Sequence, residues 1–504
     1  HVCLLAFTMM RSWSRLGGRA VVVGGGPVGA AAGVVLRRHG FDVHIFERFP
    51  DLRVQQLNAR RSINLVLARR GLRLAESLGL RESLLETAVP VYGRMMHTLN
   101  GGEHYQPYGH EHECNYAIGR GILNSFWLQE AEKAGVKLHF ERLLENFSLD
   151  DGVVTFTSSE VPAASGVDKR NDVIVKKDSS GHLETIDGVD LLIGCDGAGS
   201  KVRTLLGPES LGMKADFVNW GYKEINFPVS ASSGLSRDAL HIWPRGKHML
   251  MALANPDGSF TGTIYVDSSD TRPDGSLPVL SEGPTFQNTN DESGANAFFA
   301  ENYPDVLERL GEGGLRDYRE NSAGLLGNVR LDQYYCLGKK APVLLAGDAA
   351  HAVVPFFGQG VQCGFEDVFV LSELLDKHGT SGTLDVIAAE YSRSRVRSCH
   401  ALREMAMDNM HEMGDRVGQE RFRLKKEVEA RIETQLSHKY RSRYAQVCYS
   451  YNDYADVLEV GSAQDMFLEK LIEGVSVADA VDMRKAESWI DDLITPEFER
   501  RGMT

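Results

Sequence analysis

The sequence lacks several features that would place it in other classes of protein. No run of about 18 apolar residues occurs in its 504 residues, so no transmembrane helix is predicted. Its seven cysteines include no Cys-x-x-Cys pair, which argues against a zinc site or a disulfide framework and favours a reducing compartment. The net charge of −14 argues against a nucleic-acid partner, because neutralising phosphates requires clustered Lys and Arg.

The overall composition is typical of a globular protein. Hydrophobic residues make up 42% and charged residues 25%, and the length predicts two or three domains. Residues 1–18 combine an apolar run with Arg11 and Arg15, and no acidic residue precedes Asp42. We interpret residues 1–18 as an N-terminal extension, with a mitochondrial-type targeting segment as the alternative.

The first motif is Gly24-x-Gly26-x-x-Gly29, between an apolar run at 19–23 and a helical pattern that ends at Gly40. Gly24 permits a tight turn, Gly26 lets a pyrophosphate approach the backbone, and Gly29 lets the helix pack on the strand. Glu47 ends the next predicted strand, where a carboxylate can bind a ribose. The pattern favours dinucleotide binding, and a βα turn without a ligand is the alternative.

Two further motifs follow apolar, strand-like runs. The run 189–194 leads into "CDGAGSKVR", and the run 343–346 leads into Gly347-Asp348 and a glycine-rich turn at Pro355–Gln362. Together the three motifs resemble those of the flavoprotein aromatic hydroxylases, over most of residues 19–377. The resemblance implies that Asp348 binds the ribityl chain of FAD, that the turn approaches the isoalloxazine ring, and that a helix from Gly360 points its positive end at the flavin. A helix or turn cap is the alternative role for Asp348.

Within that family, several segments resemble the members that act on L-kynurenine, including "RRSINLVLARRG", "GRMMHTLNG", "LHIWPR" and "GDAAHAVVPFFGQG". The similarity implies that Arg94 binds the substrate carboxylate, beside Tyr108, with Asn409 and Tyr444 as further contacts. Without the resemblance, a surface ion pair for Arg94 and a packing role for Tyr108 would be favoured. The FAD contacts implied by the glycine motifs and the resemblance are Gly24, Gly26, Val28, Gly29, Glu47, Arg48, Val66, Arg120, Leu143, Asp348, Gly360, Val361 and Gln362. Val361 and Gln362 stand where the family often has Met-Asn, which leaves backbone contacts as the expected interaction. His351 is predicted to be a structural hydrogen-bonding residue, and no metal site is predicted.

The predicted fold is α/β, with a Rossmann-like FAD-binding domain, an antiparallel-sheet substrate domain and a C-terminal helical region. The FAD domain is expected to be discontinuous, with segments 19–90, 109–215 and 330–378. The substrate domain is assigned to 91–108 and 216–329, and the helical region to 379–504. Val161–His182 and Ser268–Gly294 are rich in polar residues and predict loops.

The expected activity is that of an FAD-dependent monooxygenase that uses NADPH transiently and O2. The resemblance implies hydroxylation of L-kynurenine ortho to its amine, through a C4a-hydroperoxyflavin, to give 3-hydroxykynurenine in tryptophan degradation. No side chain is expected to act as a strong base, because the flavin performs the chemistry. The alternatives are a related hydroxylase of another aromatic carboxylate and a flavin-dependent isoprenoid reductase. The expected location is the cytoplasm or the surface of the mitochondrial outer membrane, with peripheral membrane association left open.

Overall fold

The computed structural model describes residues 17–54, 63–110, 113–158, 183–268, 283–379, 383–412 and 420–503. The loop predicted at Val161–His182 lies outside the described residues, as do residues 269–282 of the loop predicted at Ser268–Gly294. The end of the latter prediction is wrong, because a helix begins at Glu292 and includes Gly294. The Asp291 side chain accepts a hydrogen bond from the Gly294 amide and caps this helix.

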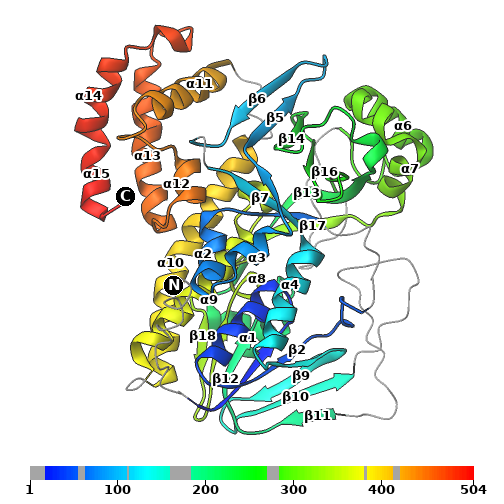
Figure 1. Ribbon diagram of the computed structural model, residues 1–504, viewed down its shortest axis with the longest axis vertical. Coiled ribbons are helices and arrows are strands. Elements are labelled where there is room, and N and C mark those ends of the chain that lie inside the picture. The colour runs from blue at the N-terminus through cyan, green and yellow to red at the C-terminus, as the bar shows by residue number, and fades with distance from the viewer. Residues whose placement is uncertain are drawn as a thin grey trace, which may run out of the picture.

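A six-stranded sheet forms the centre of the lower half of the molecule (Figure 1). Its strand order is β18-β19-β12-β1-β2-β8, and β19, β12, β1, β2 and β8 are parallel. The "RAVVV" of β1 is suited to this central position because valine has a high β-propensity and both faces of the sheet are covered. The bounds are β1 Arg19–Val23, β2 Asp42–Phe46, β8 Lys137–His139, β12 Val189–Gly194, β18 Tyr335–Leu337 and β19 Pro342–Leu345.

Helices from distant parts of the chain cover this sheet. Helix α1 starts with a proline, whose fixed φ angle suits the first helical turn, and packs against α4 and α9. Gly40, with φ of +91°, follows the end of α1 and allows the chain to turn back into β2. The helices are α1 Pro27–Arg38, α2 Arg69–Ser77, α3 Arg81–Leu85, α4 Arg120–Lys133, α5 Lys201–Leu206, α8 Asp348–His351 and α9 Gly360–His378.

Two three-stranded sheets flank this core. One has the order β11-β10-β9, and the other has the order β3-β7-β4. The strands are β3 Asn64–Leu67, β4 Val89–Val91, β7 Asn115–Gly119, β9 Arg142–Ser148, β10 Val153–Ser158 and β11 Leu183–Ile186.

A seven-stranded sheet stands above the six-stranded one (Figure 1). Its order is β17-β13-β16-β15-β14-β5-β6, so residues 93–107 join a sheet formed mainly by residues 214–330. The prediction of a purely antiparallel sheet is wrong at one pair, since β5 runs parallel to β14. Helices α6 Glu292–Asn302 and α7 Pro304–Glu320 were also not predicted. The strands are β5 Gly93–His97, β6 Glu103–Pro107, β13 Lys214–Phe227, β14 Ala239–Pro244, β15 Met249–Ala254, β16 Phe260–Asp267 and β17 Gly324–Arg330.

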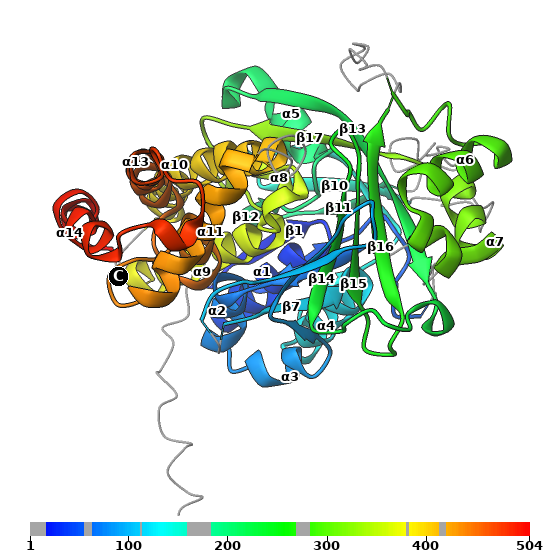
Figure 2. The same cartoon turned by 90° about the horizontal axis from the view of Figure 1, so that it is seen from above.

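The C-terminal part of the chain is helical and lies on one side of the molecule (Figures 1 and 2). Helix α10 packs against α9 and α13 and so connects this part to the core. Residues between 428 and 494 form a second hydrophobic cluster of their own, apart from the main core. The helices are α10 Leu384–His411, α11 Glu420–Gln435, α12 Arg443–Tyr449, α13 Tyr454–Leu471, α14 Met483–Leu493 and α15 Thr495–Arg501. Within the described residues, every helix is too short or too polar to cross a bilayer.

Candidate functional site

The ends of four parallel strands bring the sequence motifs together at one edge of the six-stranded sheet. Strands β2, β1, β12 and β19 are consecutive neighbours in parallel register. Glu47 follows β2, Gly24 follows β1, Cys195 follows β12 and Gly347 follows β19. Ligands of open α/β sheets bind outside this carboxyl edge, so the arrangement defines the candidate cofactor site.

In the first glycine turn, two of the three motif glycines leave no room for a side chain, and the third has open space beside it. Gly24 has φ of +103°, and a Cβ atom there would lie 2.4 Å from the Cys195 carbonyl oxygen. A Cβ atom on Gly29 would lie 2.0 Å from the Gly24 oxygen, whereas one on Gly26 would meet no atom within 4 Å. Because Pro27 begins α1, the free N–H groups of its first turn start at Val28. Open space beside these donors fits a pyrophosphate.

Glu47 braces this turn from the end of β2. Its carboxylate accepts hydrogen bonds from the Gly25 amide at 2.7 Å and the Phe49 amide at 2.9 Å. Burial raises the pKa of Glu47, and these two hydrogen bonds oppose that effect. A carboxylate has about four lone-pair positions, so acceptor capacity remains for the ribose hydroxyls predicted to bind there.

Asp348 is exposed although its neighbours in sequence are buried. It begins α8, directly after Gly347, whose φ of +61° turns the chain at the end of β19. Within the described part of the chain, no group donates a hydrogen bond to the Asp348 carboxylate. The alternative role as a cap is therefore not seen, and the free acceptor at the strand edge fits the ribityl hydroxyls of FAD.

The N-terminus of α9 presents backbone rather than side chains to the same edge. The Gln362 side-chain oxygen accepts hydrogen bonds from the amides of Ala68 at 2.8 Å and Gly71 at 3.2 Å. Its side-chain nitrogen donates to the Gly358 oxygen at 2.9 Å. The Gln362 side chain thus joins α9 to α2, which leaves the N–H groups of the first turn, from Gly360 through Val361 to Gln362, as the groups able to face a flavin.

The other predicted FAD contacts lie in several different elements. Arg120 is exposed at the start of α4, and Leu143 is half-buried in β9. Val66 is half-buried in β3, and Val28 lies in the first turn of α1. The exposed Arg48 stacks on the Phe49 ring, with Cζ 4.7 Å from the ring centroid. Their contact with the cofactor stays a prediction.

The "DG" motif after β12 is a structural turn. The Asp196 carboxylate accepts hydrogen bonds from the Ser200 hydroxyl at 2.6 Å and from the amides of Lys201 and Val202. The buried Arg203 then donates to the Ala349 oxygen at 2.7 Å. The motif therefore fixes α8, and with it the position of Asp348.

The predicted substrate residues meet at a separate cluster. The Arg94 guanidinium lies against two tyrosine rings, with Cζ 4.7 Å from the Tyr444 centroid and 5.4 Å from the Tyr108 centroid. The two rings are stacked, with centroids 5.3 Å apart. No acidic side chain forms an ion pair with Arg94 among the described residues. Burial lowers the pKa of Arg94, but Tyr444, Tyr108 and, to a smaller extent, Glu412 outweigh burial and raise it. Glu412 itself pairs with Lys426 at 3.3 Å. A half-buried guanidinium held by aromatic faces is suited to bind a carboxylate.

Two phenylalanines connect this cluster to the turn that precedes α9. The Phe357 ring stacks on Tyr444 with centroids 5.7 Å apart. The Phe356 ring packs against Tyr265 of the seven-stranded sheet, with ring centroids 5.3 Å apart. The Phe356 backbone oxygen accepts a hydrogen bond from the Asn409 side-chain nitrogen at 2.6 Å. All four predicted substrate residues therefore converge on the predicted flavin turn, although Asn409 acts on its backbone.

Sequence reasoning missed Asn115, which holds the tyrosines in place. Its side-chain nitrogen donates to the Tyr444 hydroxyl at 3.0 Å, and its oxygen accepts from the Tyr449 hydroxyl at 3.2 Å. Asn115 is buried at the start of β7 and belongs to no motif. Only a fold that brings together residues more than 300 positions apart reveals this role.

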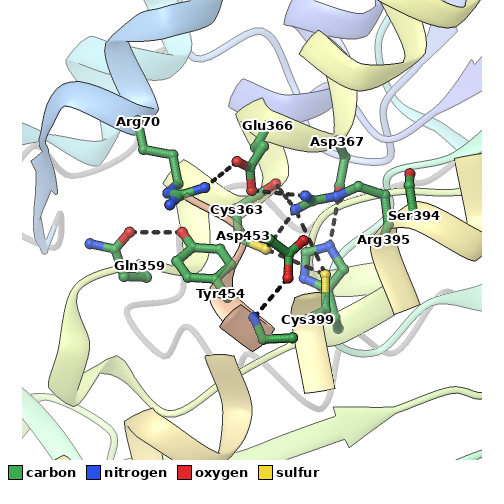
Figure 3. A network of polar contacts seen from close by, with 12 residues as sticks. Arg70, Gln359, Cys363, Glu366, Asp367, Ser394, Arg395, Cys399, Asp453 and Tyr454 are labelled. Carbon is green, nitrogen blue, oxygen red and sulfur yellow. Dashed lines mark hydrogen bonds and ion pairs between the residues drawn. The ribbon is translucent and has the colours of Figure 1, made fainter. Parts of the chain in front are cut away.

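A buried network behind the turn was also missed, and Figure 3 shows it. Arg395 of α10 donates to the Asp367 carboxylate at 2.7 Å and to the Glu366 carboxylate at 2.8 Å. Arg70 of α2 pairs with the other Glu366 oxygen. The His351 ring bonds to Asp367 at 2.5 Å, which is the structural role predicted for this histidine. These pairs join α2, α8, α9 and α10 beneath the strand edge.

Comparison with known proteins identifies the class of this fold and site. The family described as "FAD binding domain" matches residues 19–274 and 328–406. Two solved structures share the fold at low identity: a 2-methyl-3-hydroxypyridine-5-carboxylic acid oxygenase, with a TM-score of 0.58 at 19% identity, and the tetracycline destructase Tet(55), with 0.55 at 14%. The alignments cover 79% of this chain and 93% of the first structure, and 78% of this chain and 89% of the second. The protein therefore belongs to the FAD-binding domain family, and it shares the fold of these two structures.

Curated relatives define the family more narrowly. Kynurenine 3-monooxygenase of Flavobacterium johnsoniae is 31% identical over 94% of this chain and 98% of the relative. The enzymes of the same name from Xanthomonas axonopodis pv. citri and Myxococcus xanthus are each 33% identical over 94% of this chain, covering 97% and 95% of their lengths. The chain belongs to the kynurenine 3-monooxygenase family, and FAD is its cofactor.

Proposed function

We propose that this protein hydroxylates L-kynurenine at the ring carbon ortho to the amine, giving 3-hydroxykynurenine with NADPH and O2 as co-substrates. The observation that carries the proposal is the Arg94 cluster, which offers a guanidinium without an acidic partner among the described residues, at the aromatic turn before α9. The names of the curated relatives support the same substrate. No second glycine fingerprint is found in the sequence, so NADPH is expected to bind transiently.

Each group in the cluster has a part in binding. The Arg94 guanidinium forms a bidentate, charge-assisted pair with the substrate carboxylate, and such bonds are worth about 1.5–3 kcal/mol. Tyr108 and Tyr444 hold the guanidinium in place through their ring faces. Phe357 extends the apolar wall toward the turn, where the substrate ring is held away from water.

Bound FAD supplies the activation of O2 and the transfer of one oxygen atom to the ring. The protein holds the two partners in position. The first-turn N–H groups of α9 stabilise negative charge on the flavin edge, and Asp348 accepts hydrogen bonds from the ribityl chain. No side chain in this arrangement needs to act as a strong base, because the aromatic amine itself activates the ortho carbon.

The test is a visible spectrum of the purified protein, followed by oxygen uptake with NADPH in the presence and absence of kynurenine. We expect a flavin spectrum and an uptake that rises with kynurenine, with 3-hydroxykynurenine as the product. A panel of aromatic carboxylates, including a salicylate, is the control for substrate class. Hydroxylation of another member of the panel in place of kynurenine would contradict the proposal, and so would substrate reduction without oxygen uptake.

A further inference from the structure

Two cysteines that lie far apart in the sequence are in contact beneath the cofactor edge. Cys363 of α9 and Cys399 of α10 are separated by 36 positions, and their sulfur atoms are 3.5 Å apart. Both side chains are buried, with exposed fractions of 0% and 2%. Neither cysteine belongs to a Cys-x-x-Cys motif, so only the packing of α9 against α10 brings them together. The labelled side chains in Figure 3 show the pair at the centre of the network.

The charges around the pair make the two thiols unequal. Burial raises the pKa of Cys399, but the Cys363 thiol and the cations His351 and Arg395 outweigh burial and lower it below its ordinary value. Burial and the neighbouring Cys399 raise the pKa of Cys363. The Arg395 guanidinium lies 3.2 Å from the Cys363 sulfur and 3.8 Å from the Cys399 sulfur. A thiolate beside a protonated thiol is the arrangement that reacts with a peroxide and then forms a disulfide.

The same cluster resembles a metal site, since ligand atoms of His351, Cys363, Asp367 and Cys399 lie within 4.8 Å of one another. Its hydrogen bonds oppose that reading. The Asp367 carboxylate already accepts from His351, from Arg395 and from the Gly347 amide at 2.8 Å. A guanidinium that touches both sulfurs would also repel a divalent cation. The hydrogen-bond donors around the two cysteines therefore favour a thiolate over a metal ion.

We propose that Cys363 and Cys399 form an oxidation-sensitive pair, which hydrogen peroxide converts into a disulfide between α9 and α10 and which thereby weakens FAD binding. Burial restricts the oxidant to a small neutral molecule. The site does not depend on which aromatic substrate the enzyme hydroxylates.

The reaction balances with peroxide as the oxidant. The Cys399 thiolate attacks one peroxide oxygen, so that an S–O bond forms, the O–O bond breaks, and the departing hydroxide takes a proton from His351 to leave as water. The Cys363 sulfur then attacks the Cys399 sulfur, the S–O bond breaks, and the leaving hydroxide takes the Cys363 proton as a second water. Together the two cysteine sulfurs lose two electrons, and one peroxide is reduced to two waters.

The network connects this chemistry to the cofactor edge. Cys363 lies in the first turn of α9, three residues after Gly360. Asp367, which balances the charge of His351 and Arg395, accepts the amide of Gly347, the residue before Asp348. A disulfide removes the thiolate and moves the two helices closer, so both the α9 N-terminus and the Gly347 turn are expected to shift.

The test uses the full-length holoenzyme, treated with hydrogen peroxide without other substrates, unfolded under alkylating conditions and digested for mass spectrometry. We expect a linked peptide that contains Cys363 and Cys399, and a fraction of released FAD that rises with it. Dithiothreitol is expected to reverse both changes. This measurement needs no variant and does not depend on the activity toward kynurenine.

Variants give the specificity of the effect. Cys363→Ala and Cys399→Ala should each abolish the peptide and the peroxide-dependent release of FAD, whereas Cys336→Ala on β18 should behave as wild type. Sulfenic or sulfinic acid without the linked peptide would overturn the pair, and so would zinc that copurifies at one ion per chain and is lost in Cys363→Ala. A linked protein that retains FAD as tightly as the reduced protein would overturn the coupling to the cofactor.

Discussion

The cofactor edge and the Arg94 cluster are built in different ways. At the cofactor edge, each element is a short contiguous motif at the end of a parallel strand, and many of the groups that line the site belong to the backbone. At the Arg94 cluster, single side chains come from β5, from the end of β6 and from α12, more than 300 residues farther along the chain. Substitutions at the first region should therefore affect folding or FAD, and those at the second should affect substrate binding alone.

The largest effect is expected from Gly29→Ala. Its Cβ atom would lie 2.0 Å from the Gly24 oxygen, which is backbone and cannot yield without opening the turn. Overpacking of this kind costs about 1–3 kcal/mol or more, so we expect little folded, FAD-bound protein in expression and thermal melts.

Gly26→Ala is the matched control, because its Cβ atom meets no protein atom within 4 Å and its φ of −67° suits alanine. We expect an apoprotein as stable as wild type, with a Kd for FAD raised about tenfold or more. Unchanged FAD affinity in Gly26→Ala would show that the pyrophosphate does not lie at this opening.

Arg94→Ala should raise the Kd for kynurenine by about 10- to 100-fold, which corresponds to the loss of one bidentate, charge-assisted pair. The flavin spectrum should stay the same, because Arg94 lies in the substrate cluster and not at the strand edge. Titration of the holoenzyme measures the change, and Arg94→Lys, which keeps the charge without the fork, should recover part of the affinity. A variant that responds to kynurenine like the parent would refute the assignment.

Asn115→Ala should weaken kynurenine binding by a smaller amount, about three- to tenfold. The substitution removes the partner of both tyrosine hydroxyls and loosens Tyr444 against Arg94. Tyr449→Phe is the control, because it deletes only the bond that does not involve Tyr444. Equal losses of affinity in the two variants would mean that Asn115 does not act through Tyr444.

The smallest effect concerns Glu433, which accepts hydrogen bonds from the amide and hydroxyl of Ser442, the N-cap of α12. Burial raises the pKa of Glu433 to about 7 from 4.5. The folded state therefore holds a proton that the unfolded state loses, and the free energy of unfolding falls as pH rises between about 4.5 and 7.

Glu433→Gln should remove this slope and leave a Tm about 2 °C above that of wild type at pH 8. Thermal melts at several pH values measure it, and the exposed Glu427→Gln serves as the control. A slope that persists unchanged in Glu433→Gln would place the titrating group elsewhere.

Residues whose type is dictated by the local backbone conformation could be predicted from the sequence. The tight turns at Gly24 and Gly347 demand a positive φ, and the apolar runs before them predict buried strands, so this edge of the sheet was visible from local pattern. Arg94, Tyr108, Asn409 and Tyr444 were found only through resemblance, because no local spacing connects them. Helices α6 and α7 were missed, since the helical period of α6 is weak and Gly311, with φ of +52°, interrupts α7. The parallel β5–β14 pair was missed because its two strands lie far apart in the sequence.

The sequence by itself determined the glycine turns, the parallel strands and the carboxylates at the strand ends, because these depend on local backbone conformation and on neighbours close along the chain. The tertiary structure alone decided that Gln362 binds α2, that Asn115 holds Tyr444, and that Cys363 meets Cys399. Each of those contacts joins residues between 36 and 329 positions apart. The local sequence around a residue carries no information about a partner at such a distance along the chain.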